Sequence, residues 1–222
     1  MNQAMYFNDT QTGRINDLIG KIEERTGIEL VAAVVGKCDS YPEIPWKAFA
    51  LGSAAGALAV LVQAFIGHGC ALLRNPQFAA AFILGAGAVF ALFSVFLPAF
   101  GRLFLDRVRA ETETEQYARS FFLERELFRT AGRTGILVLV GLFERTVVIL
   151  PDSGVHGRLE QEKLQKVIAT MTPLLSRKDR YEAILQGLNA LEAELLRAGF
   201  ETTKKSGSEI ADGLVQDKGE DR

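Results

Sequence analysis

The sequence predicts an α/β fold: a three-layer-type sandwich with a small mixed sheet, interrupted by a two-helix transmembrane hairpin. Three observations lead to this prediction. Residues 48–101 form two long apolar segments whose only charged residue is Arg74. Strand-like runs stand on both sides of these segments, at 28–36 and at 135–150. Helical patterns flank the strands, so the chain can place helices against a sheet.

The composition narrows the range of partners. The formal net charge is −2, and the isoelectric point near 5.8 gives no electrostatic reason to expect nucleic acid. Hydrophobic residues make up 48% of the 222 residues, and they are concentrated in the two apolar segments. The expected partners are therefore the lipid bilayer and an unidentified membrane protein.

Each apolar segment is long enough to cross a bilayer. A helix needs about 20 apolar residues to span the hydrocarbon core. Residues 48–73 and 78–101 both meet this length without a charge, and Arg74-Asn75-Pro76-Gln77 between them has the composition of a turn. We therefore predict a helical hairpin and not two buried helices of a soluble protein.

Small residues predict how the two helices pack. Gly52 and Gly56 stand four residues apart in the first segment, a spacing that lets helix backbones approach closely. Ala81, Gly85 and Ala88 offer a similar stripe in the second segment. The stripes favour packing of the two helices on each other over dimerisation of the chain through this face.

The distribution of Lys and Arg predicts the orientation. These residues are enriched on the cytoplasmic side of membrane proteins. Arg74 lies alone in the link between the segments, whereas six basic residues lie toward their outer ends: Lys37, Lys47, Arg102, Arg107, Arg109 and Arg119. We predict a protein of the bacterial inner (cytoplasmic) membrane, with two spans and both termini in the cytoplasm.

Residues 1–47 and 102–200 are predicted to be two parts of one domain. The first part supplies a helix capped by Asp9 or Thr10 and the strand at 28–36. Neither part alone covers the edges of its strands, so the strand at 28–36 should join the later strands. The second part supplies one long helix at 102–129, strands at 135–142 and 146–150, and helices at 158–176 and 179–198.

The later strands and the end of the chain allow two further predictions. Only Phe143-Glu144-Arg145 separates the runs at 135–142 and 146–150, so these strands must form an antiparallel hairpin. Residues 201–222 are too polar to pack, and a disordered tail is expected there.

Short motifs on both sides of the apolar segments resemble a known family. They are Glu24-Arg25-Thr26-Gly27, Arg133-Thr134-Gly135, Glu144-Arg145 followed by Asp152 and Gly154, and Gly187-Leu188 in the closing helix. With these motifs, residues 14–36 and 115–200 resemble the TPM domain family, which includes thylakoid acid phosphatase, photosystem II repair and receptor-modulator proteins. The chain departs from the family pattern because the apolar hairpin interrupts the domain and an early acidic segment is missing. It also departs in its distribution of Lys and Arg, which predicts a cytoplasmic domain, whereas TPM domains are often lumenal or extracytoplasmic.

Asp152 is the candidate for a catalytic or metal-binding residue. If 28–36 runs parallel to 135–142, Asp152 lies at the same sheet end as Gly27 and far from Cys38. A carboxylate is a hard ligand that suits calcium or magnesium. The alternative, which we prefer, is that Asp152 and Ser153 cap a helix that begins near Gly157.

Other residues at this end are weaker candidates. Arg133, Thr134, Ser153 and His156 are the candidates for ligand binding, yet no Ser/His/Asp set or metal-spaced histidines accompany them. Cys38 follows Lys37, a neighbour that could lower the pKa of its thiol, although we expect a spectator thiol.

Two functions fit the sequence. The first is a membrane-anchored TPM-like domain that acts as a non-enzymatic accessory or interaction module for a membrane complex. The alternative, implied by the resemblance, is a membrane-anchored phosphatase that could depend on calcium or magnesium. No cofactor is predicted for the first function.

Overall fold

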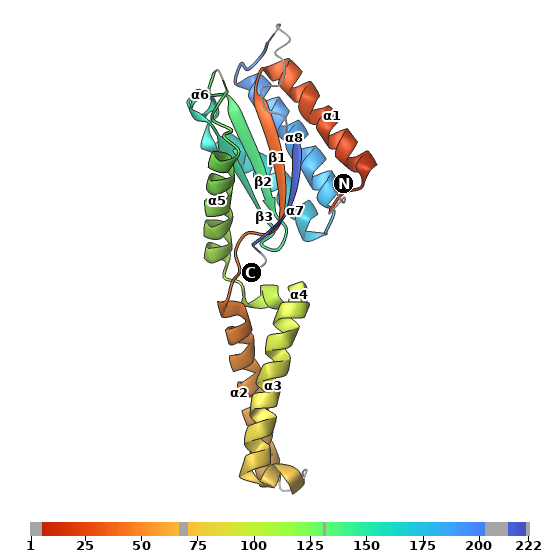
Figure 1. The fold of residues 1–222 in the computed structure, drawn as a ribbon, viewed down its shortest axis with the longest axis vertical. Helices are drawn as coiled ribbons and strands as arrows, with labels where there is room; N and C mark the ends of the chain where they lie inside the picture. The colour runs from red at the N-terminus through yellow and green to blue at the C-terminus, as the bar shows by residue number, and fades with distance from the viewer. Residues whose placement is uncertain (1–5, 67–70, 131, 203–212, 221–222) are drawn as a thin grey trace. The chain divides into compact units, whose positions relative to one another are not determined.

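The computed structural model describes residues 6–66, 71–130, 132–202 and 213–220, and it shows a mixed α/β chain. The chain forms two compact units (Figure 1). One unit combines Met1–Asp39 with Ala110–Arg222, and the other is Ser40–Arg109. In the sequence, residues 40–109, which contain the two long apolar helices, thus separate the two segments of the first unit.

The first unit is built on a sheet with the strand order β3-β2-β1-β4. Strands β2 and β3 are antiparallel, as predicted for 135–150. Strands β1 and β2 are parallel, which fulfils the condition stated above for 28–36 and 135–142. The elements of this unit are α1 (Asp9–Thr26), β1 (Glu29–Lys37), α5 (Arg107–Glu124), β2 (Gly135–Gly141), β3 (Thr146–Pro151), α6 (Ser153–His156), α7 (Gln161–Ser176), α8 (Arg180–Arg197) and β4 (Leu214–Gly219).

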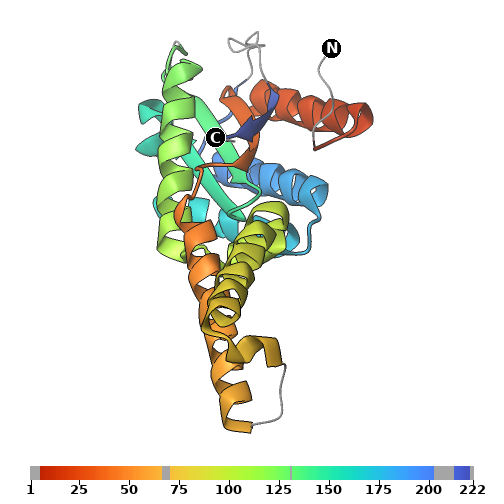
Figure 2. The ribbon, with the colours of Figure 1, turned by 60° about the horizontal axis from the view of Figure 1, so that its bottom comes forward.

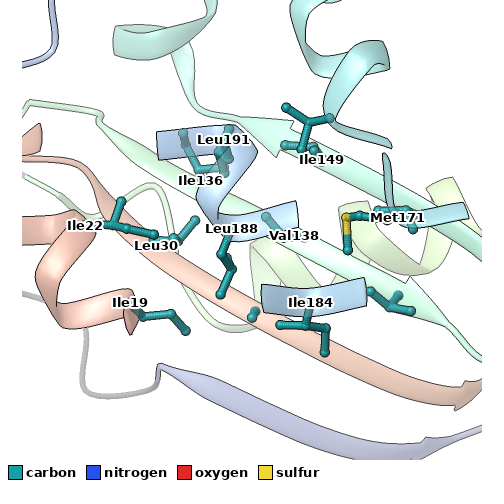
Figure 3. Close-up of a cluster of buried hydrophobic side chains, with 14 of the residues drawn as sticks. Ile19, Ile22, Leu30, Ile136, Val138, Ile149, Met171, Ile184, Leu188 and Leu191 are labelled. Atoms are coloured by element: carbon teal, nitrogen blue, oxygen red, sulfur yellow. The ribbon is translucent and has the colours of Figure 1, made fainter. Parts of the chain in front are cut away.

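Helices cover both faces of the sheet (Figures 1 and 2). Because side chains alternate along a strand, each central strand contributes to two cores. On one face, Leu30 and Val138 pack with residues of α1, α7 and α8, including Ile22 and Leu188 (Figure 3). On the other face, residues of β1 and β2 pack with Ala118 and other residues of α5. The two-sided burial explains why these strands are almost continuously apolar.

Helix α1 begins earlier than predicted. Asn8 is the N-cap, and neither Asp9 nor Thr10 has this role. The Asn8 side chain accepts a hydrogen bond from the Gln11 amide, and the Gln11 side chain accepts one from the Asn8 amide, which completes a capping box. At the other end, Gly27 adopts φ of 69°, so glycine suits the turn into β1.

The prediction of a disordered tail over 201–222 is wrong for residues 214–219. These residues form β4, which pairs in parallel with the open edge of β1. Only Leu214 and Val215 are apolar at its start, so no alternating pattern marks the strand. Its position depends on backbone pairing and on polar contacts, such as Leu214 N donating to Asn16 Oδ1 and Tyr6 N donating to Gln216 Oε1.

The second unit is a helical hairpin of α2 (Glu43–Ile66) and α3 (Pro76–Phe96), with short turns η1 (Ala71–Arg74), α4 (Pro98–Gly101) and η2 (Arg102–Phe104). Helix α2 begins earlier than the predicted 48–73. Helix α3 ends at Phe96 and not at 101, because Leu97 precedes Pro98 and takes an extended conformation.

The single helix predicted over 102–129 is divided. Leu105 is extended after η2, and α5 begins at Arg107 and ends at Glu124. The Asp106 carboxylate accepts a hydrogen bond from the Arg109 amide, so it supplies a local start signal for the new helix.

The two long helices pack on each other through small residues, as predicted. A Cβ on Gly52 would lie 2.7 Å from the Ala86 carbonyl oxygen, and one on Gly56 would lie 3.2 Å from Cα of Ile83. The stripe predicted on the second helix, Ala81, Gly85 and Ala88, is wrong because all three residues are exposed. The contacting face of α3 instead carries Ile83, Ala86, Gly87 and Phe90.

Both helices are long and apolar enough to cross a membrane, by length and composition. Large apolar side chains are exposed along the hairpin, and Phe65 reaches an exposed fraction of 90%. Gly52, Gly56 and Gly87 are buried, whereas most of the large apolar side chains of the hairpin face outward. This distribution is the reverse of what a water-soluble helix pair shows.

Candidate functional site

Asp152 lies where β3 ends and is the N-cap of α6. Its amide donates to the Gly135 carbonyl over 2.8 Å, which ties it to the start of β2. Its Oδ1 accepts a 2.6 Å hydrogen bond from the Ser153 amide. The residue is only 5% exposed. The predicted capping role is therefore present, although the capped helix begins at Ser153 and not near Gly157.

Arg133 is the charged neighbour of Asp152. Its Nε lies 3.0 Å from Asp152 Oδ2, while its own side chain is 54% exposed. Oδ2 accepts no hydrogen bond from the residues that the structure describes, so the contact is an ion pair without hydrogen-bond alignment. The guanidinium also lies over the Phe128 ring, with 5.6 Å to its centroid. Packing and charge together hold Arg133 over the carboxylate.

The other predicted residues meet at the same end of the sheet. The Thr134 amide donates to the buried Thr130 hydroxyl over 2.8 Å. The Gly154 amide donates to the Arg133 carbonyl, and a Cβ at Gly154 would come within 2.3 Å of the Gly132 carbonyl. Arg133, Thr134, Asp152 and Ser153 are thus brought together by two turns in close contact, and glycine is required where they meet.

His156 contributes little to this arrangement. It is the last residue of α6, its side chain is exposed, and its amide donates to the Asp152 carbonyl over 2.9 Å. Within residues 6–66, 71–130, 132–202 and 213–220, no group of three His, Cys, Asp or Glu residues could hold a metal ion. Chemically, the site offers one buried carboxylate, one half-exposed guanidinium and the hydroxyls of Thr134 and Ser153.

A second polar cluster, which the sequence analysis missed, lies at the other end of the parallel strands. Glu144, in the link between β2 and β3, is buried, and its Oε1 accepts a 2.9 Å hydrogen bond from the Cys38 amide. Gly141 is needed here, since its Cβ would lie 2.7 Å from Glu144 Oε2 and 3.1 Å from Cys38 Sγ. One feature of the sequence could have revealed this cluster: the charged Glu144 in the short link between two buried strands.

The Cys38 thiol is buried, and burial raises its pKa far above the ordinary value. The neighbouring Glu144 raises it further, whereas a hydrogen bond with Thr114 acts in the opposite direction. The thiol is therefore protonated at neutral pH and is a poor nucleophile, which agrees with the predicted spectator role and not with activation by Lys37.

Tyr117 and Asp217 extend this cluster toward β4. The Tyr117 hydroxyl donates to Asp217 Oδ2 over 3.3 Å. Burial raises the pKa of Tyr117, and the Asp217 carboxylate adds to the shift. The contact connects α5 with the strand that the sequence did not predict.

The two clusters do not form one site. Glu29 pairs with Gly135 at the Asp152 end of the sheet, and Val35 pairs with Gly141 at the Cys38 end. The full length of β1 thus separates Cys38 from Asp152, as predicted.

Comparisons with known proteins agree with this fold. Searching curated proteins gave no match. The NMR structure of the BA42 protein from the psychrophilic bacterium Bizionia argentinensis is similar, with a TM-score of 0.56 and 11% identity, over 97% of this chain and 99% of that chain. At this identity the similarity concerns the fold alone.

A family model gives the remaining match. It covers residues 103–194, which include α5, β2, β3 and α7 and most of α8, together with Arg133 and Asp152. The matched segment begins within η2, at the end of the second unit, so it does not include the resemblance proposed for residues 14–36. Residues 103–194 of this chain match the TPM domain family.

Proposed function

We propose that the chain is a membrane-anchored, TPM-like domain protein that acts as a non-enzymatic accessory or interaction module for a membrane complex. The observation that carries this proposal is the surface of the hairpin. Gly52, Gly56 and Gly87 lie at the contact between α2 and α3, while large apolar side chains such as Phe65 and Phe96 face outward. A lipid bilayer is the partner that such a surface fits.

The topology of the sheet supports the proposed orientation. Strand β1 precedes the hairpin, β2 follows it, and the two are paired from Glu29–Gly135 to Val35–Gly141. If the hairpin enters a membrane, it must return the chain to the side it left. Because the basic residues near the outer ends of the hairpin favour the cytoplasmic side, we place both termini in the cytoplasm.

The environment of Asp152 favours a structural role over a catalytic one. Its Oδ1 caps α6, and its Oδ2 faces Arg133. A carboxylate held in this way completes a turn without any substrate. The domain would therefore act through its surface, held close to the bilayer by the hairpin.

The alternative function is a membrane-anchored phosphatase. One observation favours it: a buried carboxylate beside a half-exposed guanidinium, together with two hydroxyl groups, could contact a phosphate ester. In this alternative, calcium or magnesium would bind at Asp152.

One experiment separates the two functions. The full-length protein carrying a C-terminal tag would be cross-linked in membranes and purified, and its turnover of a phosphomonoester would be measured with and without calcium or magnesium. We expect a defined membrane protein to co-purify and no turnover above that of the Asp152→Asn variant. Metal-dependent turnover that is lost in Asp152→Asn would establish the phosphatase instead.

A further inference from the structure

At the C-terminal end of α3, the chain folds into the short helical segments α4 and η2. Helix α3 has 21 residues, which at about 1.5 Å per residue gives about 32 Å, close to the thickness of a hydrocarbon core. The extended Leu97 and Pro98 then turn the chain into α4 and η2. The segment 98–104 therefore begins where a membrane-spanning α3 would reach the headgroups.

Aromatic rings hold this segment against the end of α3. The Phe100 ring packs edge-on against Phe90, Phe93 and Phe104, with centroids 5.7, 6.3 and 5.4 Å away. Gly101 lies so close to the Ser94 carbonyl that a Cβ would be 2.6 Å from it. The turn is thus a packed part of the hairpin.

The start of α2 lies at the same level. Lys47 Nζ donates to the Phe104 carbonyl over 3.1 Å, which joins the two helices at this end. Trp46 beside it is 72% exposed, and Leu103 is 76% exposed. Tryptophan with exposed apolar side chains at the end of a spanning helix is typical of the membrane–water boundary.

The charge at this level is positive. Lys47, Arg102, Arg107 and Arg109 stand here with two acidic residues, Glu43 and Asp106. Glu43 forms a 2.8 Å ion pair with Arg109, and Asp106 accepts a hydrogen bond from the Arg109 amide. With four basic and two acidic residues, residues 43–47 and 98–109 carry a formal net charge of +2.

We propose that Trp46, Lys47, Arg102, Leu103 and Arg107 form an interfacial belt that binds the headgroups of anionic phospholipids. The proposal rests on the membrane anchoring proposed above. Trp46 and Leu103 enter the boundary between headgroups and acyl chains, and the three cations gather phosphate groups of negatively charged lipids around the hairpin. The belt would fix the depth of the hairpin and enrich one class of lipid around it.

The chain provides its own probe, because Trp46 is its single tryptophan. Full-length protein would be reconstituted in phosphatidylcholine vesicles that contain a small fraction of acyl-brominated phosphatidylglycerol or, in parallel, acyl-brominated phosphatidylcholine. Bromine quenches the fluorescence of a tryptophan in contact with the labelled lipid. The ratio of the two quenching curves gives the preference of the belt for the anionic headgroup.

We expect a preference of about fivefold for phosphatidylglycerol at low salt, which a single well-placed cation can supply, and a decrease as salt is raised. The variant Lys47→Gln/Arg102→Gln/Arg107→Gln should quench equally with both lipids. Arg74→Gln, which removes the cation at the other end of the hairpin, should keep the preference, as should the charge-conserving Arg102→Lys.

Each result has a separate meaning. Equal quenching of the unaltered protein by both lipids, at every salt concentration, would refute the belt and leave the membrane anchor standing. No quenching by either lipid would refute the anchor as well. Since the salt series uses the unaltered protein, a triple variant that fails to fold would not prevent the decision.

Discussion

At the scale of single residues, Asp152 and Glu23 show two ways in which this fold uses a carboxyl group. Asp152 is almost fully buried and gives its oxygens to a helix cap and to Arg133. Glu23 is partly buried at the end of α1. Its pKa is raised to about 7, chiefly by burial; the hydrogen bond from the Leu30 amide acts to lower the pKa, and the charge of Glu29 acts to raise it. The sequence predicted the cap at Asp152, whereas the raised pKa of Glu23 could not be predicted from it, because that shift depends on burial in the folded chain.

Changes at Asp152 test its role as a cap. Asp152→Ala removes the acceptor for the Ser153 amide, so the free energy of unfolding should fall by about 0.5–2 kcal/mol. Asp152→Asn keeps an acceptor and loses only an ion pair with a half-exposed arginine, which contributes about 0–1 kcal/mol. Ser153→Ala is the matched control, since Ser153 takes part through its amide. Denaturant unfolding in detergent measures all three, and an Asn variant as unstable as the Ala variant would contradict the cap.

Glu23 predicts a dependence of stability on pH. Between its ordinary value of 4.5 and about 7, the folded chain binds a proton at this carboxyl that the unfolded chain has released. The free energy of unfolding should therefore fall as the pH rises through this interval and level off above it. In Glu23→Gln this contribution should be absent, so the variant should be more stable than the unaltered protein above about pH 7.

The control for Glu23 is its exposed neighbour Glu24. Glu24→Gln should leave the decline between these pH values unchanged. Thermal unfolding of the three proteins across the pH range provides the comparison, and a decline of equal size in Glu23→Gln would show that another group is responsible.

At the scale of elements, the sequence predicted the helices and strands whose apolar residues recur in a pattern set by burial. Strands β1 and β2 are apolar on both faces, and α8 carries its buried leucines at helical spacing, so their existence could be predicted. Strand β4 could not be predicted, because it is defined mainly by backbone pairing with β1 and less by the burial of its side chains. The contact face of α3 could not either, because a helix that is apolar all round has no pattern to fix its rotation.

The hairpin contact gives a matched pair of substitutions. A Cβ at Gly52 would meet the Ala86 carbonyl at 2.7 Å and Phe90 at 2.8 Å, whereas a Cβ at Gly85 would meet nothing within 4 Å. Gly52→Ala should force α2 and α3 apart at a cost of about 1–3 kcal/mol. Gly85→Ala should be neutral or stabilise the helix by up to about 1 kcal/mol.

The free energies of unfolding of the two variants would be measured with the purified proteins in mixed detergent micelles that contain increasing SDS. The order of the two variants is the decisive result. If Gly85→Ala were the more disruptive of the two, the exposed stripe with Ala81 and Ala88 would be a contact face, and dimerisation through it would regain support.

At the scale of the whole molecule, the sheet determines what the hairpin can be. The parallel pair β1–β2 joins residues that are more than 100 positions apart in sequence, and unit Ser40–Arg109 lies between them. The candidate site at Asp152 uses the start of β2 and the end of β3, so its geometry also requires the completed sheet. This long-range pairing was predictable because each half would otherwise expose an apolar strand edge.

The same reasoning gives the last prediction. Replacing residues 40–109 with a flexible glycine–serine linker should leave a water-soluble domain that unfolds cooperatively, since β1–β4 and their helices all belong to the other unit. A fragment of residues 110–222 alone should not fold, because β2 would lose its parallel partner and half of each core would be open to water. Circular dichroism and size-exclusion chromatography of the two proteins provide the test. A cooperative, monomeric transition for the fragment without β1 would show that the sheet does not depend on the strand before the hairpin, and aggregation of the linked domain would show that the hairpin is needed for more than anchoring.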